Sequence, residues 1–293
     1  MSTINQDSSP ARQAHSLLWI LPSFTWLLFF IFLPLVFVFL LSLTRREPTG
    51  EIEWALGVSN YVRAFDKLYA VIYFRSLFLA GACTLLCLIL AFPLAYFIAL
   101  QKSASVKNVW LFLVTLPFWT SFLVRTYAWI IILRTEGLIN KGLMECGLIH
   151  EPLNLLYNNF AILIGLVYGE LPFMILPLYT VLEKIEKSLL EASSDLGSSP
   201  SQTFYRVILP LCHSGISAGV ILVFIPSLGA FITPDLLGGA KSMMVGNLIQ
   251  SQFTIVRDQP FGSAIAFLLT AAVLVLLALS YKTARRSAEV KIL

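Results

Sequence analysis

One acidic residue stands inside a long apolar stretch of the chain, where a charge is expensive. Glu170 lies in NNFAILIGLVYGELPFMILPLYTVL, and no other Asp or Glu occurs within the apolar runs. A carboxylate surrounded by hydrocarbon is costly, so such a residue usually faces a protein interior or a water-filled cavity and is a candidate for function. We expect Glu170 either to line a path for a solute or to be structural, as a protonated acid or in an ion pair.

A basic residue in another apolar run is the candidate partner for that ion pair. Arg125 lies in LPFWTSFLVRTYAW, residues 116–129. An arginine at this depth usually faces a protein or water-filled interior, and Glu170 is expected on a neighbouring span. The alternative is that Arg125 extends its head group to the outer surface, since it lies only about two helical turns from Arg134.

Three other patterns have the spacing of reactive sites but lack the required context. The segment 215–219, GISAG, matches the G-x-S-x-G pattern of hydrolases, but it opens an apolar helix, so small-residue helix packing is expected. The segment 238–242, GGAKS, lacks the second glycine and the strand of a phosphate-binding loop. Cys83 and Cys87 have no further ligands nearby, so we expect them to pack as small apolar residues and to bind no metal.

The elements that must position these residues are membrane helices. The chain is 58% hydrophobic and 12% charged, whereas soluble domains contain about 25% charged residues. A bilayer crossing needs about 20 predominantly apolar residues. The runs of that length are 17–43, 76–100, 108–133, 158–182, 213–233 and 260–281. The sequence therefore predicts an all-α integral membrane protein with six transmembrane helices.

Six spans place both termini on the same side of the membrane. We expect residues 1–16 to form a polar tail, 17–281 the transmembrane domain and 282–293 a second, basic tail. The first run is too long for the apolar part of a signal peptide and is expected to be retained. Lysine and arginine divide almost evenly between the two sides, but the basic cluster at 282–286 favours cytoplasmic termini. The net charge of +4 is scattered over many loops, so no nucleic-acid partner is expected.

Small residues and prolines indicate how the fourth span packs. Gly165 and Gly169 have the spacing that lets a neighbouring helix approach closely. Pro172 and Pro177 should interrupt the backbone hydrogen bonds of the same span. Farther along, residues 243–256 carry apolar side chains at helical spacing, which predicts an amphipathic helix along the outer surface.

The polar loop at 183–212 carries helix signals that a flexible connector would not need. Ser188 with Glu191 three residues later is a capping-box pattern, in which two side chains satisfy free backbone N–H groups at a helix start. A short helix at about 189–196 should follow.

The same loop then stops and restarts its helix. Gly197 can take a left-handed conformation after a helix end without a Cβ clash. Ser199 and Gln202 form a second capping box, with Pro200 at the first helical position. These signals predict two short helices that meet at a tight corner and form a rigid protrusion that binds a partner.

This loop resembles a signature of the permease subunits of ABC importers: Glu-Ala-Ala, three residues, Gly, nine residues, then Ile-x-Leu-Pro. Matching residues are Glu191, Ala192, Ser193, Gly197, Val207, Leu209 and Pro210, with Ser193 replacing Ala and Val207 replacing Ile. In that family the loop docks into a groove of an ATPase subunit. The resemblance implies a type I ABC importer permease fold, with cytoplasmic coupling helices within 183–212. The alternative is that Glu191 only caps its own helix.

Longer stretches resemble the permease subunits of spermidine/putrescine importers. They are LPFWTSFLVRTYAW, GLVY-x-x-LPFMILPLY, and DLLGGAKSMMVGNLIQSQF followed by RDQPFGSA. The resemblance implies a transport subunit that is not an enzyme and binds no cofactor, in a bacterial inner membrane with both termini cytoplasmic. It also implies three kinds of partner: a second homologous permease, a dimer of ATPase subunits that uses ATP and Mg, and a periplasmic or tethered substrate-binding protein.

A path for polyamines should offer carboxylates and aromatic faces without binding too tightly. The candidates for such a path are Glu170, Asp235, Trp119, Tyr127 and Tyr168, with Arg125 as a gate or a structural charge. Two alternatives remain open: an ABC permease for another small solute, such as thiamine, an aminophosphonate or an anion, and a stand-alone secondary transporter. For an anion, Arg125 would be the natural contact.

Overall fold

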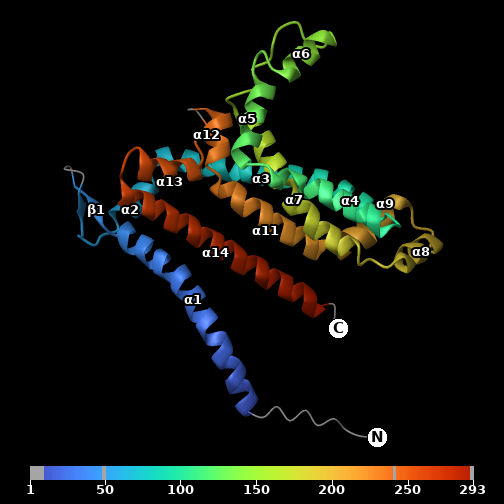
Figure 1. The fold of residues 1–293 in the computed structure, drawn as a ribbon, viewed down its shortest axis with the longest axis horizontal. Helices are drawn as coiled ribbons and strands as arrows, with labels where there is room; N and C mark the ends of the chain where they lie inside the picture. The colour runs from blue at the N-terminus through green and yellow to red at the C-terminus, as the bar shows by residue number, and fades with distance from the viewer. Residues whose placement is uncertain (1–9, 48–50, 240–241, 291–293) are drawn as a thin grey trace. The chain divides into compact units, whose positions relative to one another are not determined.

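The computed structural model describes residues 10–47, 51–239 and 242–290, with side chains described for 21–47, 51–239 and 242–280. Most of the chain is helical (Figure 1). The helices are α1 (Pro10–Ser42), α2 (Ser59–Ala64), α3 (Lys67–Ala99), α4 (Ala104–Thr115), α5 (Phe122–Leu133), α6 (Leu138–Glu145), α7 (Asn159–Leu182), α8 (Lys187–Asp195), α9 (Pro200–Thr203), α10 (Leu209–Leu211), α11 (His213–Gly229), α12 (Ile232–Gly238), α13 (Val245–Thr254) and α14 (Gln259–Val290). Shorter elements are the 3-10 helix η1 (Leu116–Trp119), the π-helix η2 (Phe204–Ile208) and the strands β1 (Arg45–Arg46) and β2 (Ile52–Glu53).

The chain divides into two units, and the first takes residues 1–64 and 252–271. In this unit β1 and β2 form an antiparallel hairpin after α1. The side-chain nitrogen of Asn60 donates to the backbone carbonyls of Ser42 and Thr44 at 2.9 and 2.7 Å. Arg63 in α2 pairs with Asp258 at 2.7 Å, just before α14 begins. These bonds hold the short elements against the end of α1.

The second unit takes residues 65–251 and 272–293, and its core is made by α3, α7 and α11. Cys83 and Cys87 are fully buried in this core, which is the packing role predicted for them. A Cβ at Gly215 in α11 would lie 2.9 Å from the carbonyl oxygen of Pro177 in α7. The 215–219 pattern therefore serves close helix packing, as expected.

The close approach predicted for α7 occurs at one of its two glycines. A Cβ at Gly165 would meet Leu237 of α12, whereas a Cβ at Gly169 would meet nothing within 4 Å. Helix α7 continues through Pro172 and Pro177, so the predicted interruption is confined to single backbone hydrogen bonds and does not break the span. Each proline removes one backbone donor, and the turns on either side retain theirs.

The third predicted span, 108–133, is wrong as a single helix. The arms 104–119 and 122–145 are bent by 90° at the break between η1 and α5. Pro117 lies in the first turn of η1 and supplies no N–H to continue the ladder of α4. The next residues, Thr120 and Ser121, have ψ of 149° and 135°, outside the helical range. The sequence LPFWTS therefore ends one helix and begins another.

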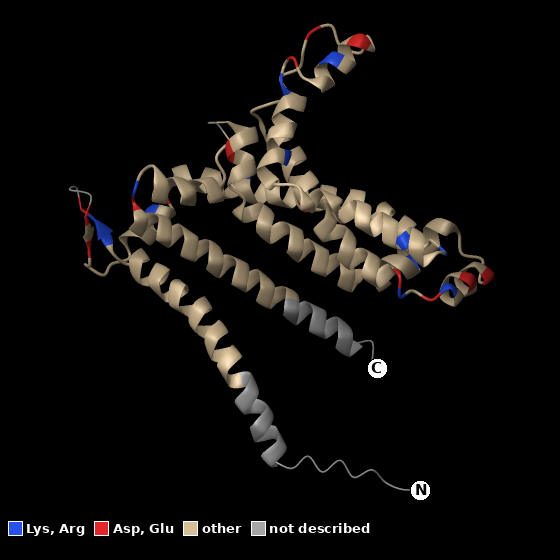
Figure 2. Cartoon of the chain, viewed as in Figure 1, with Lys and Arg blue, Asp and Glu red and all other residues tan. Residues whose placement is uncertain are grey.

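Four helices in the described part of the chain are long and apolar enough to cross a membrane, and each of two bent pairs could supply one more. The first bent pair is the one just described, and the second joins 200–211 to 213–229 at 66°. The six predicted spans are recovered when each bent pair counts as one span. Charged residues gather in loops and at helix ends, while most of the helical ribbon carries none (Figure 2).

Three segments differ from the sequence prediction in extent or setting. Helix α1 begins at Pro10 and α14 runs to Val290, so both enter segments expected to be tails; residues 1–9 and 291–293 lie outside the described residues. Helix α13 was expected, but not its burial: Asn247 and Gln252 are each 6% exposed. Asn247 donates to the carbonyl of Phe231 at 2.6 Å, so its polar side chain serves packing and does not face solvent.

Candidate functional site

The loop between α7 and α11 begins with α8, and its first predicted cap is wrong. The N-cap residue is Glu186, and its side chain makes no capping hydrogen bond. Ser188 lies inside the helix, where its hydroxyl donates to the Glu186 carboxylate at 3.2 Å. Leu189, and not Glu191, therefore occupies the third helical position. The alternative that Glu191 only caps its own helix does not hold.

The end of α8 forms as predicted. Gly197 has φ of +78°, the left-handed region that glycine enters without a Cβ clash. Its N–H donates to the carbonyl of Ser194 at 2.9 Å, and the N–H of Ser198 donates to that of Ser193 at 3.1 Å. This pair of bonds is the Schellman motif, which satisfies the last carbonyls of a helix.

The second predicted capping box is confirmed. Ser199 Oγ accepts a hydrogen bond from the N–H of Gln202 at 3.3 Å, and Gln202 Oε1 accepts one from the N–H of Ser199 at 3.0 Å. Pro200 is the first residue of α9, where its missing N–H leaves no donor unpaired. The chain restarts its helix at Pro200, three residues after Gly197.

A hydrogen bond joins the two short helices of this loop to each other. Ser193 Oγ lies 3.0 Å from Thr203 Oγ1, and the Ser193 residue is 8% exposed. Next to Thr203, the Phe204 ring contacts Phe92 of α3 edge-on, with ring centroids 5.2 Å apart. Ser193, which replaces the alanine of the family signature, thus connects α8 to α9, and α9 leads into the helical core.

The loop exposes an apolar surface with an acidic residue beside it. Leu189 and Leu196 are 46% and 87% exposed, and their seven-residue separation places them on one side of the loop. Glu191 and Ala192 are also exposed. We call Leu189, Glu191, Ala192 and Leu196 the coupling face. Exposed leucines on a loop whose backbone is fixed by caps are suited to docking in a groove of another protein.

An ion pair fixes the root of this loop. Lys107 in α4 donates to Glu183, the residue that ends α7, at 2.9 Å. The Tyr179 hydroxyl and then the Lys107 ammonium hold the pKa of the Glu183 carboxyl below its usual value. Sequence reasoning missed this pair, because 76 residues separate its members and both read as ordinary surface charges.

The structure brings Arg125 and Glu170 into one region but does not pair them. Among the described residues no ion pair joins the two, and Arg125 Nε and Glu170 Oε2 are buried atoms without a hydrogen-bond partner. The guanidinium lies 5.7 Å from the ring centroids of both Phe118 and Phe122. The ion pair considered as one role for Glu170 is therefore absent. The burial of Nε argues against Arg125 extending freely to an outer surface.

The aromatic candidates differ in their surroundings. Tyr168 in α7 contacts Trp129 in α5 edge-on, with ring centroids 5.7 Å apart. Trp119 at the end of η1 is 80% exposed and Tyr127 is 54% exposed. Asp235 is exposed on α12, which packs against α5 and α7. Tyr168 is itself 38% exposed, so all four residues have exposed side chains and Tyr168 differs by its ring contact with Trp129.

Phe118 and Phe173 were not among the predicted site residues. Their ring centroids lie 5.0 Å apart, and Phe118 also faces Arg125. Both residues belong to Leu-Pro-Phe tripeptides, at 116–118 and 171–173. That repeated tripeptide is the signal that could have identified them.

Comparison with known proteins is consistent with this arrangement. Residues 91–286 match the family described as binding-protein-dependent transport system inner membrane component. The spermidine/putrescine transport system permease protein PotB of Haemophilus influenzae is 41% identical over 259 residues, which cover 88% of this chain and 90% of that protein. PotB of Escherichia coli is 41% identical over 260 residues, with 89% and 94% covered.

Solved structures of low sequence identity share the fold. A bacterial ABC transporter involved in the import of the acidic polysaccharide alginate gives a TM-score of 0.72 at 18% identity, over 94% of this chain and 96% of that chain. An alginate ABC transporter in complex with an alginate pentasaccharide-bound periplasmic protein gives 0.76 at 17% identity, with the same coverage. With the fold and the family match in agreement, this chain belongs to the inner-membrane components of binding-protein-dependent transport systems and has the type I fold of an ABC importer permease.

Proposed function

We propose that this chain is the permease subunit of an ATP-driven importer that carries spermidine and putrescine. The observation that carries this proposal is 41% identity to PotB permeases over nearly the whole length of both chains. The predicted stretches around Arg125, Glu170 and the segment 235–253 lie within the matched family region. Homologous positions along a shared path favour a shared class of solute.

Three partners complete this importer. A second, homologous permease supplies the other half of the path, and a dimer of ATPase subunits uses ATP and Mg. A periplasmic or tethered protein delivers the substrate, as the periplasmic protein in the complex of the solved alginate transporter suggests by analogy. The chain takes no part in hydrolysis and lies in the inner membrane with both termini and the coupling face on the cytoplasmic side.

The loop 183–212, here called the coupling loop, transmits the ATPase cycle to the membrane helices. Closure of the ATPase dimer on ATP draws the docked loops of the two permeases together. Because Gly197, the Ser199 cap and the Ser193–Thr203 bond leave the loop few alternative conformations, its movement passes to α7 and α11 as a displacement of helices. The two permease halves then change from inward-open to outward-open, and hydrolysis returns them.

Along the proposed path, several groups can each make a weak contact with a cation. Glu170 provides a carboxylate oxygen that no group in the described part of the chain satisfies. Asp235 and the faces of Trp119, Tyr127 and Tyr168 extend the same chemistry, because aromatic faces attract ammonium groups. Arg125 acts as a gate or structural charge, repelling cations until the helices move.

The test is uptake into vesicles that hold the complete complex. Labelled spermidine and putrescine are supplied with the binding protein, with and without ATP on the ATPase side. Thiamine, an aminophosphonate and unlabelled polyamine serve as competitors. We expect ATP-dependent uptake that only polyamines compete away.

Each other result removes a part of the proposal. Hydrolysis without movement of either polyamine would leave an ABC permease with a different substrate. Uptake that continues without ATP would instead indicate a stand-alone secondary transporter.

A further inference from the structure

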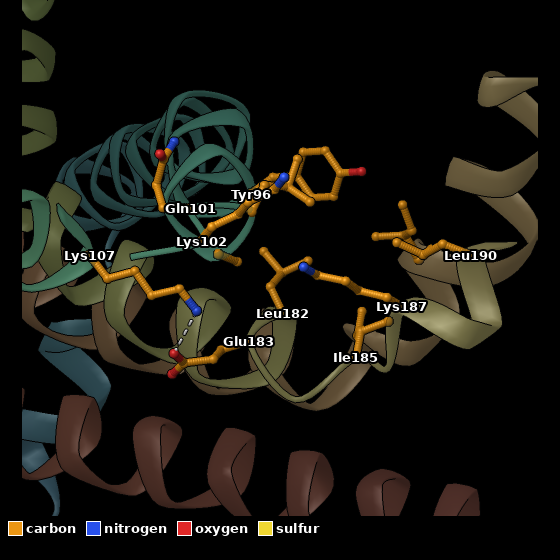
Figure 3. A pocket seen from close by; sticks show the side chains of 12 residues that line it. Tyr96, Gln101, Lys102, Lys107, Leu182, Glu183, Ile185, Lys187 and Leu190 are labelled. Atoms are coloured by element: carbon orange, nitrogen blue, oxygen red, sulfur yellow. Dashed lines mark hydrogen bonds and ion pairs between the residues drawn. The ribbon is translucent and has the colours of Figure 1, made fainter. Parts of the chain in front are cut away.

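A cavity of about 410 Å³ lies at the root of the coupling loop (Figure 3). Its walls come from the ends of α3 and α7, the turn after α3, the first turns of α4 and the start of α8. All of these segments belong to the second unit of the chain. The cavity is separate from the coupling face, since none of the four residues of that face lines it.

The charge of this cavity is positive. Lys102, Lys107 and Lys187 enter it from the turn after α3, from α4 and from α8, as Figure 3 shows. Glu183 is the acidic residue of the lining, and its carboxylate is paired with Lys107 at 2.9 Å. In the described part of the chain neither Lys102 nor Lys187 forms an ion pair. Two uncompensated ammonium groups therefore share one cavity.

Apart from Tyr96 and Gln101, the remaining wall is apolar, and it lies where two long apolar helices end. Leu182, Ile185 and Leu190 line the cavity beside the lysines. Helix α3 ends at Ala99 and α7 at Leu182, and both helices are long and apolar enough to cross a membrane. The cavity thus lies where lipid head groups meet the hydrocarbon, with basic groups and apolar groups side by side.

We propose that this cavity binds the head group of an anionic phospholipid of the cytoplasmic leaflet, with its phosphate between Lys102 and Lys187. The cytoplasmic assignment rests on the proposed function. A free phosphate ion would gain nothing from the apolar wall, whereas the glycerol and first acyl carbons of a lipid would cover Ile185 and Leu190, which are partly exposed. Lys187 and Leu190 are one helical turn apart on α8, so a bound lipid would support the helix that carries the coupling face.

Lipid binding to the assembled complex tests the proposal without any transport assay. The purified complex is delipidated, titrated with phosphatidylglycerol, cardiolipin or phosphatidylcholine, and examined by native mass spectrometry. The variant Lys102→Gln/Lys187→Gln removes both free charges, and Lys184→Gln is the matched control, since Lys184 is an exposed lysine of the same loop that does not line the cavity.

We expect the native complex to bind phosphatidylglycerol and cardiolipin in preference to phosphatidylcholine. Each lysine near a membrane surface contributes about fivefold in affinity for anionic lipid, so the double variant should bind about 25-fold more weakly at this site. Lys184→Gln should bind as the native complex does. Glu183→Gln raises the positive charge by one and should strengthen binding about fivefold.

Three results would overturn the proposal. Equal binding by the native complex and the double variant would mean that these lysines hold no head group. Equal binding of phosphatidylcholine would reduce the site to an apolar contact. If millimolar inorganic phosphate alone displaces the bound lipid, the glycerol moiety contributes nothing to binding, and the cavity is a site for the free ion. Because no outcome depends on uptake, failure here is distinct from failure of the transport assignment.

Discussion

The coupling loop and the region around Glu170 satisfy their polar groups in opposite ways. In the loop, Gly197 and Ser199 end one helix and begin the next, and Ser193 bonds to Thr203 across the corner. Around Glu170 a carboxylate oxygen and a guanidinium nitrogen are buried without a hydrogen-bond partner among the residues that the structure describes. Buried polar atoms without partners are rare in folded proteins, and each calls for a physical explanation.

The difference indicates that the loop satisfies its polar groups within this chain, whereas the region around Glu170 does not. The loop is built to keep one shape, so it can transmit a displacement. The region around Glu170 keeps buried polar atoms without partners among the described residues and an 80% exposed Trp119, which is what the proposed path requires of a surface that a second permease and a passing solute complete. Breaking the loop should uncouple the importer, while changing the path should alter what moves through it.

Gly197→Val should have the largest effect. A residue with a Cβ in the left-handed region costs about 1–2 kcal/mol, which corresponds to roughly five- to thirtyfold in an equilibrium. Since the strain falls on the corner of the coupling loop, ATP-dependent uptake should drop by about that factor. The measurement is polyamine uptake into vesicles that hold the complete complex.

Gly147→Val is the matched control for that prediction. Gly147 also has a positive φ, +71°, with nothing within 4 Å of an added Cβ, but it lies after α6 and outside the coupling loop. The same backbone strain there should leave uptake close to native. Equal losses in both variants would attribute the effect to general destabilisation.

Glu170→Gln should have the next largest effect and should act on the path alone. Loss of the carboxylate removes roughly 1 kcal/mol of attraction for a cation at contact distance, about fivefold in uptake. ATP hydrolysis by the same complex should be retained, because the coupling loop is unchanged. Glu145→Gln on α6, at an exposed site, should leave both activities unchanged. Unchanged uptake in Glu170→Gln would remove Glu170 from the path.

The Ser193–Thr203 bond should contribute less. Since a single neutral hydrogen bond is worth about 1 kcal/mol and only part of that loss is transmitted to docking, Ser193→Ala and Thr203→Val should each reduce affinity for the ATPase by about two- to threefold. In a double-mutant cycle the two losses should not add. Ser194→Ala is the control, since among the described residues Ser194 Oγ donates to the carbonyl of Leu190 in its own helix and does not reach α9. Full additivity would mean that the two hydroxyls act independently.

The Lys107–Glu183 pair should have the smallest effect, and it should depend on pH. Because the folded protein lowers the Glu183 pKa, the pair stabilises the fold above the ordinary value of 4.5 and loses that contribution as pH falls below it. Exposed pairs are worth about 0.2–1 kcal/mol. Lys107→Gln should therefore lower thermal stability slightly at pH 7 and not at all near pH 3. An equal decrease at both pH values would contradict the assignment.

Local sequence signals predicted the loop because they act over a few residues. Proline at a first helical position, a glycine after a helix end and the Ser199 to Gln202 spacing each determine backbone geometry directly. The cap at Ser188 failed for a related reason: two acidic residues, Glu186 and Glu191, compete for roles at one helix start, and the pattern alone does not decide between them. The six apolar runs were likewise readable from length and hydropathy.

Features that depend on contacts between distant parts of the chain could not be predicted from the sequence. The sequence predicted a continuous span at 108–133, since hydropathy does not record the 90° bend that Pro117 and Thr120 allow. An ion pair between Arg125 and Glu170 was one expectation, because opposite charges on neighbouring spans favour pairing. In the structure the Arg125 guanidinium lies over the rings of Phe118 and Phe122 instead. The Lys107–Glu183 pair could be identified only from the three-dimensional structure, because its members are far apart in the sequence.

The most direct test of the central claim is a crosslink from the coupling face to the ATPase. In a Cys146→Ser background, a cysteine replaces Leu196, which is 87% exposed, or Leu148, which is 72% exposed in the loop after α6. Each complex is treated with a short bifunctional reagent in the membrane. We expect Leu196→Cys to crosslink to the ATPase subunit and Leu148→Cys not to. A crosslink from Leu148→Cys alone would place the ATPase on the opposite side of the permease and contradict the account.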